Sequence, residues 1–359
     1  MSKSKNIGTI TLCGLIVGPV LGSGIVLLPP LAYKLIGKWA IPAWIIIMLL
    51  GIIFAYVFVF LSLKSPGNKG VAIAIGNAFG NFFRELTSNF LTAAVCFGPT
   101  AVLITAAGFL KSFSFFSNIK VEMIAFGMEI ICALILICGV KALTKFTLIL
   151  TGLTAVLLLS GIIYTLIFAS NVHTPETSFS FSKFGYTLLL LFWAIMTPLF
   201  GSFSLPIITI AASGLCMCTY LMIVGGVSRM SAKRASNNKL PFYLSYVNKN
   251  GSPINAIITL VCIHLVVLSL AAANFLSLDK IVTCANVFFL SNAIVGLAAG
   301  FKLLHNIKLK IAISILIVSF TLLLFKAALW SLSLLIIVVL LSIYNNKRLN
   351  KQKVPNFCG

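Results

Sequence analysis

Residues 9–33 read TITLCGLIVGPVLGSGIVLLPPLAY, a run of 25 residues without a charged side chain. About 20 consecutive apolar residues are enough to cross the hydrocarbon core of a bilayer as an α-helix. The whole chain has 359 residues, of which 60% are hydrophobic and 9% are charged, whereas a soluble domain has roughly 25% charged residues. So few charges cannot solvate a globular surface of this size, and we therefore predict an all-α membrane protein.

Ten further apolar runs follow the first one, and the basic residues between them predict the topology. The runs span residues 40–63, 87–110, 121–140, 146–169, 186–201, 204–228, 253–275, 279–301, 309–325 and 328–344. With a cytoplasmic N-terminus, and with 186–201 entering and leaving on one side, the cytoplasmic segments hold 19 of the 26 Lys and Arg residues. An excess of Lys and Arg in the cytoplasmic loops is typical of membrane proteins. We therefore predict about ten crossings, one short broken or re-entrant element, and both termini in the cytoplasm.

The sequence of the irregular element agrees with this topology. Pro198 and Gly201 interrupt the run at 186–201, and Pro206 follows shortly after it. Proline and glycine are tolerated at membrane depth where the backbone lines a cavity walled by protein.

The first run contains a candidate binding segment. Three glycines spaced by four residues, over Gly14–Gly22, form a small-residue face on which another helix can pack. Packing does not explain Gly22-Ser23-Gly24, which follows Pro19 at mid-membrane and favours local unwinding of the helix. Unwinding would free backbone N–H groups for a carboxylate and carbonyl groups for an ammonium. The spacing alone favours a binding site and a packing face about equally.

These residues resemble the first-helix signature of the amino acid–polyamine–organocation superfamily, which Gly22–Ile25 and Leu28-Pro29 match. The stretch Ser65–Gly80 is similar to the segment after helix 2 of that superfamily. More narrowly, the chain resembles the bacterial inner-membrane exporters of methionine and branched-chain amino acids. Further matches are Phe192-Trp193, Ser228-Arg229-Met230 and Ala285-Asn286.

The resemblance implies a single membrane domain over residues 1–359 with a five-plus-five inverted repeat. The expected parts are a first repeat at about 9–169, a shortened second repeat at about 186–301, trailing helices at about 309–344 and a cytoplasmic tail at 345–359. The chain departs from the family where part of helix 6 and all of helix 7 are expected. Only the first half of helix 6 is recognisable, at about 186–196, before what looks like helix 8. We therefore expect a truncated transporter fold.

The resemblance also implies a substrate site between broken helices 1 and 6. The backbone around Ser23 and Gly24 would bind the substrate carboxylate, the carbonyl groups of Val20 and Leu21 the ammonium, and aromatic rings would flank the side chain. The candidate substrate-binding residues are Val20, Leu21, Gly22, Ser23, Gly24, Ile25, Phe192, Trp193 and Asn286.

Two ionisable residues inside the runs are candidates for other roles. The chain has five acids, and Glu129 is the one that lies well inside a run, roughly 12 Å along its helix. An intramembrane acid is a functional candidate, here for carrying a coupling proton. The alternative is a protonated carboxyl group that hydrogen-bonds a neighbouring helix. His264 is expected to be a neutral buried histidine with one partner rather than a proton relay.

Several function classes are disfavoured by the sequence. The net charge of +21 is scattered between apolar runs, which indicates membrane topology and argues against nucleic-acid binding. Cys216 and Cys218 have no nearby His or acid with which to bind a metal. We find no catalytic arrangement of acids, Ser and His, and so predict no enzyme, metal or cofactor.

The predicted function is secondary active transport, as export, of neutral apolar amino acids such as methionine, leucine, isoleucine and valine across the bacterial inner membrane. So few charges in the spans leave no obvious counter-charge for a charged substrate. The expected partners are the amino acid, a coupling proton and membrane lipid. A degenerate relative that does not transport, or a membrane sensor or assembly partner, is the alternative.

Overall fold

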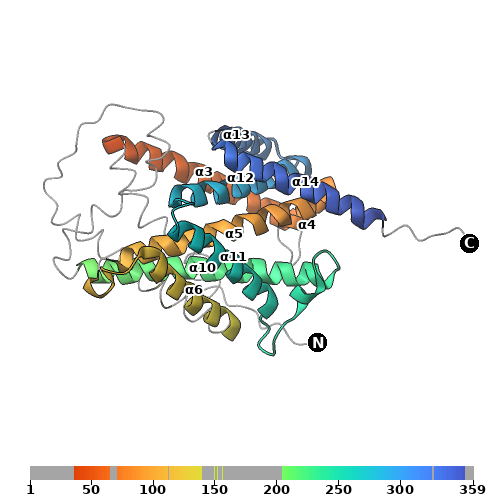
Figure 1. Cartoon of the computed structure of the whole chain (residues 1–359). Coiled ribbons are helices and arrows are strands. Elements are labelled where there is room, and N and C mark those ends of the chain that lie inside the picture. The colour runs from red at the N-terminus through yellow and green to blue at the C-terminus, as the bar shows by residue number, and fades with distance from the viewer. Residues whose placement is uncertain are drawn as a thin grey trace, which may run out of the picture. The chain divides into compact units, whose positions relative to one another are not determined.

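The computed structural model describes residues 36–64, 71–111, 113–139, 204–325 and 327–351, and three isolated positions at 149, 152 and 156. Over these residues the regular structure is entirely helical (Figure 1), which confirms the predicted all-α fold. The α-helices are α3 (Ala40–Lys64), α4 (Val71–Phe79), α5 (Asn81–Leu110), α6 (Val121–Cys138), α10 (Ser204–Ser236), α11 (Ile254–Ala272), α12 (Leu278–Leu303), α13 (Ile307–Phe325) and α14 (Leu329–Lys351). Short 3-10 helices are η1 (Gly37–Trp39), η2 (Ser114–Phe116) and η4 (Phe242–Ser245).

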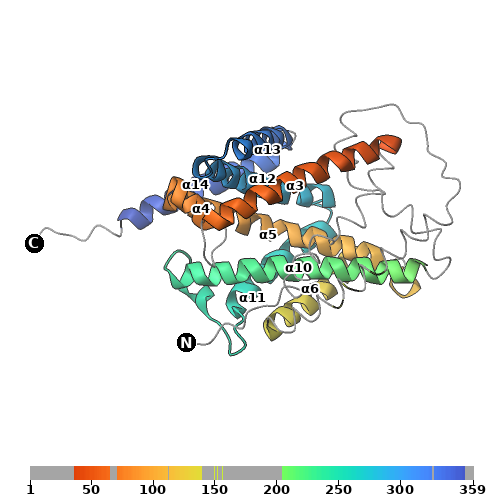
Figure 2. The same cartoon turned by 180° about the vertical axis from the view of Figure 1, so that it is seen from behind.

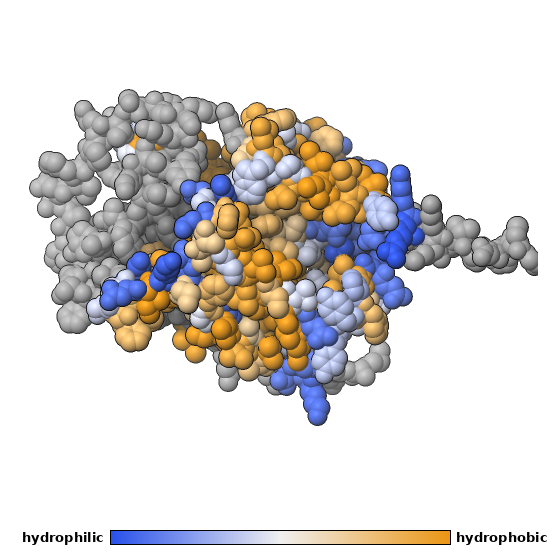
Figure 3. Space-filling view, in the orientation of Figure 1, coloured by the Kyte–Doolittle hydropathy of each residue, from blue (hydrophilic) through white to orange (hydrophobic). Residues whose placement is uncertain are grey.

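Eight α-helices of the described part are long and apolar enough to cross a membrane. They are α3, α5, α6, α10, α11, α12, α13 and α14. They coincide with eight of the eleven predicted runs, so the chain is a multi-pass membrane protein. The run at 9–33, the irregular element at 186–201 and, apart from three positions, the run at 146–169 lie outside the described residues. Many large apolar side chains on the helices are exposed, and most of the coloured surface in Figure 3 is apolar, as a lipid-facing surface requires.

The chain divides by its contacts into two compact units. Unit 1 comprises residues 1–47 and 99–278, and its described helices include α6, α10, α11 and the C-terminal part of α5. Unit 2 comprises residues 48–98 and 279–359, with most of α3 and α12, the N-terminal part of α5, and α4, α13 and α14.

Unit 2 is held together by apolar packing. A buried cluster joins α3, α12 and α13, and a second joins α5, α12 and α14. Asn89 of α5 donates a hydrogen bond of 2.8 Å to the hydroxyl of Ser342 on α14, which ties these two helices at a polar point within the apolar contact.

The short helix α4 was not anticipated from the sequence, and α5 begins at Asn81 rather than at residue 87. Gly80, with φ of +87°, separates the two helices in a conformation that side chains disfavour. Lys302 of α12 donates a hydrogen bond of 2.7 Å to the carbonyl of Ala78, one of the last carbonyls of α4. Such carbonyls have no partner within the helix, so a lysine from α12 stabilises this end.

A close approach at Gly296 gives a test of the packing in unit 2. A Cβ atom there would lie 3.1 Å from the ring of Phe58 and 3.4 Å from a methyl group of Val71. Gly296→Val should therefore lower the free energy of unfolding by about 1–3 kcal/mol, as overpacking typically does. The measurement is thermal unfolding in detergent. Gly51→Val, on α3 of the same unit with no atom within 4 Å, is the control and should change stability less. Equal losses would contradict the packing.

Candidate functional site

The candidate site lies where α6, α10 and α11 pack against one another in unit 1, side by side in both Figure 1 and Figure 2. The buried residues of α6 fall in one stripe: Ile124, Ala125, Met128, Glu129, Cys132 and Leu136. Those of α11 form a similar stripe: Ala256, Ile257, Leu260, His264, Val267, Leu268 and Ala271. This spacing places one face of each helix in the interface. The α6 stripe contains one carboxyl group, that of Glu129, and the α11 stripe contains one imidazole, that of His264.

Three polar side chains meet in this interface. Glu129 of α6, Tyr220 of α10 and His264 of α11 each have no exposed surface. Each lies near the middle of its helix, and therefore near the middle of a candidate span. We call these three residues the buried polar cluster.

Hydrogen bonds join all three members of the cluster. The phenol hydroxyl of Tyr220 donates to Oε1 of Glu129 in a short hydrogen bond. Nδ1 of His264 lies 3.0 Å from the same oxygen and 3.1 Å from the Tyr220 hydroxyl. The rings of Tyr220 and His264 meet edge to face, with centroids 5.6 Å apart. One carboxylate oxygen therefore connects three membrane-spanning helices.

The hydrogen-bond pattern identifies the donors. A phenol has one hydrogen, and Tyr220 gives it to Glu129. Nδ1 of His264 lies within hydrogen-bond distance of the same oxygen and is the second donor in the tautomer that carries its hydrogen on Nδ1. Oε1 of Glu129 then accepts two hydrogen bonds, which both a carboxylate oxygen and the carbonyl oxygen of a protonated carboxyl group can do.

The second carboxyl oxygen of Glu129 differs from the first. Oε2 is buried and has no hydrogen-bond partner among the residues that the structure describes. Burying an ionised carboxylate with a bare oxygen is costly, and a proton on that oxygen removes most of the cost. Among the described residues, Oε2 is therefore the carboxyl oxygen of Glu129 that takes no part in the hydrogen bonds of the cluster.

The titratable neighbours of the cluster are thiols. Cys132 lies one helical turn after Glu129, and Cys218 lies near it on α10; both are fully buried. Thiols are ordinarily neutral at physiological pH.

The described part of the structure contains only some of the residues that the sequence analysis singled out. Glu129 and His264 are brought together, and His264 contacts both Glu129 and Tyr220, so the expectation of a single partner was wrong. Asn286 lies on α12 of unit 2 with an exposed side chain, and its role in substrate binding stays a prediction. The other candidate substrate-binding residues lie outside the described residues: Val20, Leu21, Gly22, Ser23, Gly24, Ile25, Phe192 and Trp193.

Sequence reasoning missed Tyr220. Its only signal was a phenol in the middle of an apolar run, where a buried hydroxyl needs a partner. An intramembrane acid elsewhere in the chain was the available partner, but the sequence does not show that α6 and α10 are adjacent.

Known proteins resemble parts of the chain. The sequence model of the amino acid permease family matches residues 7–204, more than half of the chain, and ends at the residue where α10 begins. A cadaverine/lysine antiporter of Escherichia coli (strain K12) is 35% identical over 113 residues, 32% of this chain and 25% of the relative. An L-methionine/branched-chain amino acid exporter of the same strain is 33% identical over 96 residues, 27% of this chain and 23% of the relative. The matched part thus spans about a quarter of each relative's length.

The cluster predicts a specific stability change. Tyr220→Phe removes one donor to Glu129 while keeping the ring, so it should lower the free energy of unfolding by about 1–3 kcal/mol. Tyr243→Phe, at an exposed ring of η4, is the matched control and should leave stability within about 0.5 kcal/mol. Unfolding in detergent measures both variants. A Tyr220→Phe protein as stable as the control would show that the cluster contributes little.

Proposed function

Because the chain belongs to the amino acid permease family, we propose that it is a secondary active transporter of neutral apolar amino acids. The supporting observation is the buried polar cluster at mid-span. Within the described spans, Glu129 is the acid at membrane depth, and its Oε1 accepts hydrogen bonds from the protein itself. A cationic substrate would need a free counter-charge in the membrane. This argues for neutral substrates such as methionine, leucine, isoleucine and valine.

The charges and one relative support the proposed direction of transport and the proposed topology. The relative named as a methionine and branched-chain amino acid exporter favours export. The basic residues between the spans favour cytoplasmic termini in a bacterial inner membrane. The substrate would bind at Val20–Ile25, with Phe192 and Trp193 beside its side chain and Asn286 as a further contact. The predicted repeats, about 9–169 and about 186–301, would enclose this site.

We propose that Glu129 carries the coupling proton. With one proton shared between Glu129 and His264, the cluster has no net charge, which is the state that a buried site favours. Loss of that proton leaves a buried negative charge. This charge favours any arrangement of α6, α10 and α11 that lets water reach Oε2. Proton release and a change in helix packing are thereby linked, which is what coupled transport requires.

Transport itself is tested with the purified chain in proteoliposomes. Labelled methionine or leucine should accumulate above the level of empty vesicles, and an excess of unlabelled lysine should not compete. Gly24→Trp should abolish uptake because it fills the predicted carboxylate site. No movement of either amino acid above empty vesicles would favour the alternative, a relative that does not transport.

The coupling role of Glu129 is tested in the same vesicles. Glu129→Gln should retain exchange of methionine across the membrane but lose accumulation driven by an imposed pH gradient, because the amide cannot take up a proton. Glu122→Gln, in the first turn of α6, is the matched control and should accumulate methionine like the wild type. Gradient-driven accumulation by Glu129→Gln, or loss of exchange along with it, would contradict the proposal.

A further inference from the structure

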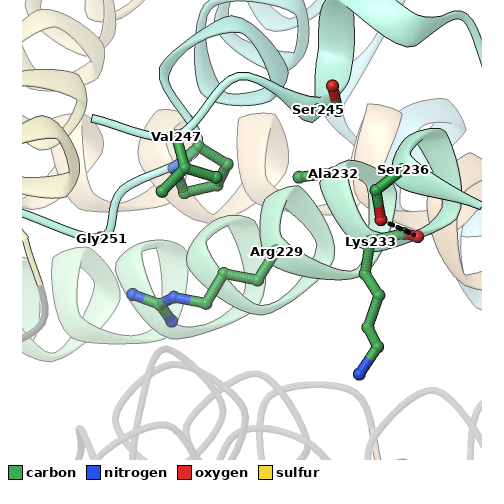
Figure 4. A pocket seen from close by; sticks show the side chains of 8 residues that line it. Arg229, Ala232, Lys233, Ser236, Ser245, Val247 and Gly251 are labelled. Carbon is green, nitrogen blue, oxygen red and sulfur yellow. Dashed lines mark hydrogen bonds between the residues drawn. The ribbon is translucent and has the colours of Figure 1, made fainter. Parts of the chain in front are cut away.

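A second polar feature of unit 1 lies at the end of α10, away from the buried polar cluster. It is a pocket of about 310 Å³, lined by Arg229, Ala232, Lys233, Ser236, Ser245, Val247, Gly251 and Pro253. Figure 4 shows Arg229 and Lys233 leaving α10 on the same side, one turn apart. The pocket thus combines two cations of one helix with the loop that follows it.

The surroundings of the pocket are strongly basic. Five Lys and Arg residues and no Asp or Glu lie between residues 229 and 253. The hydroxyl groups of Ser236 and Ser245 donate to backbone carbonyls, at 2.9 and 2.6 Å. Arg229 and Lys233 are therefore the side chains that can donate to a ligand, and an anion is the ligand that suits them.

The loop that closes the pocket is fixed by specific contacts. Ser252 donates to the carbonyl of Leu136 at 2.9 Å, and Asn248 donates to the carbonyl of Ile137 at 3.2 Å. These are among the last carbonyls of α6, which lack partners within their own helix. Gly139, with φ of +104°, lets the chain pass close to Asn250. The loop that lines the pocket is therefore held in place by hydrogen bonds to the end of α6.

The segment that contributes Ser245 and Val247 to the pocket also carries exposed aromatic rings. Phe242 and Tyr243 of η4 are 74% and 55% exposed, and Tyr246 is 58% exposed. Leu244 between them is buried with Ala235 and Ala256, and Asn255 donates to the carbonyl of Tyr243 at 2.7 Å. The segment is thus anchored while its rings face outward. Aromatic rings at the end of a membrane span are characteristic of the headgroup level of a bilayer.

We propose that this pocket binds the phosphate of an anionic phospholipid headgroup. Arg229 and Lys233 contact the phosphate, and the rings of Phe242 and Tyr246 lie against the adjoining glycerol and acyl region. Basic pockets at the cytoplasmic ends of spans suit such headgroups, and the proposed topology puts this end in the cytoplasm. A free phosphate ion would use the two cations but would have no use for the aromatic rings, which is why a lipid is the better ligand.

The test is a titration of the delipidated full chain, in a neutral detergent, with phosphatidylglycerol, followed by native mass spectrometry. The double variant Arg229→Gln and Lys233→Gln should weaken the tightest binding by at least about tenfold. The control, Lys308→Gln and Lys310→Gln at the start of α13, loses the same charge and should bind within about twofold of the wild type. The charge-retaining Arg229→Lys should keep most of the binding, provided that all variants show the wild-type melting temperature.

A third variant separates a lipid from a free ion. Phe242→Ser should weaken binding of phosphatidylglycerol but not of inorganic phosphate, which is titrated in parallel. Equal lipid binding by the double variant and the control would overturn the proposal. So would displacement of the lipid by inorganic phosphate with no effect of Phe242→Ser, because the pocket would then be a site for the ion alone. Neither result depends on whether the protein transports amino acids.

Discussion

The arrangement of α6, α10 and α11 depends on one atom, Oε1 of Glu129, which accepts hydrogen bonds from a tyrosine on one neighbouring helix and a histidine on the other. Helices in lipid associate without a hydrophobic driving force, because lipid tails are as apolar as the side chains, and close packing and interhelical hydrogen bonds decide which helices pair. A polar contact at mid-span favours one particular pairing of helices, because a buried polar group without a hydrogen-bond partner costs free energy. The cluster thus specifies how three helices pack and also places two titratable groups at membrane depth.

The same constraint gives the cluster its chemistry. Among the described residues, one carboxyl oxygen of Glu129 accepts hydrogen bonds and the other has no partner, and burial costs much more for the ionised carboxylate than for the protonated carboxyl group. Under the proposed coupling role, the protonated state favours the packed interface and the deprotonated state favours access of water. A transporter needs an element whose packing depends on an ion it moves. We propose that the cluster has that property, and that the basic pocket at the end of α10 instead binds a lipid headgroup.

The sequence predicted the all-α fold and eight spans correctly, because length and hydropathy set these features locally. It also indicated Glu129, since an acid within an apolar run is conspicuous. It could not pair Glu129 with Tyr220 and His264, which are 91 and 135 residues away, because helix adjacency is a tertiary property. It missed α4 because that helix has only nine residues, Val71–Phe79, which is too short to stand out as an apolar run.

The central claim is that Glu129 exchanges a proton during transport. Infrared difference spectroscopy of the purified protein, with and without bound methionine, tests it most directly. The claim predicts a change in a carboxyl C=O stretching band in the wild type, which is absent in Glu129→Gln and present in Glu122→Gln. A wild-type spectrum without a carboxyl change, or the same change in Glu129→Gln, would contradict it.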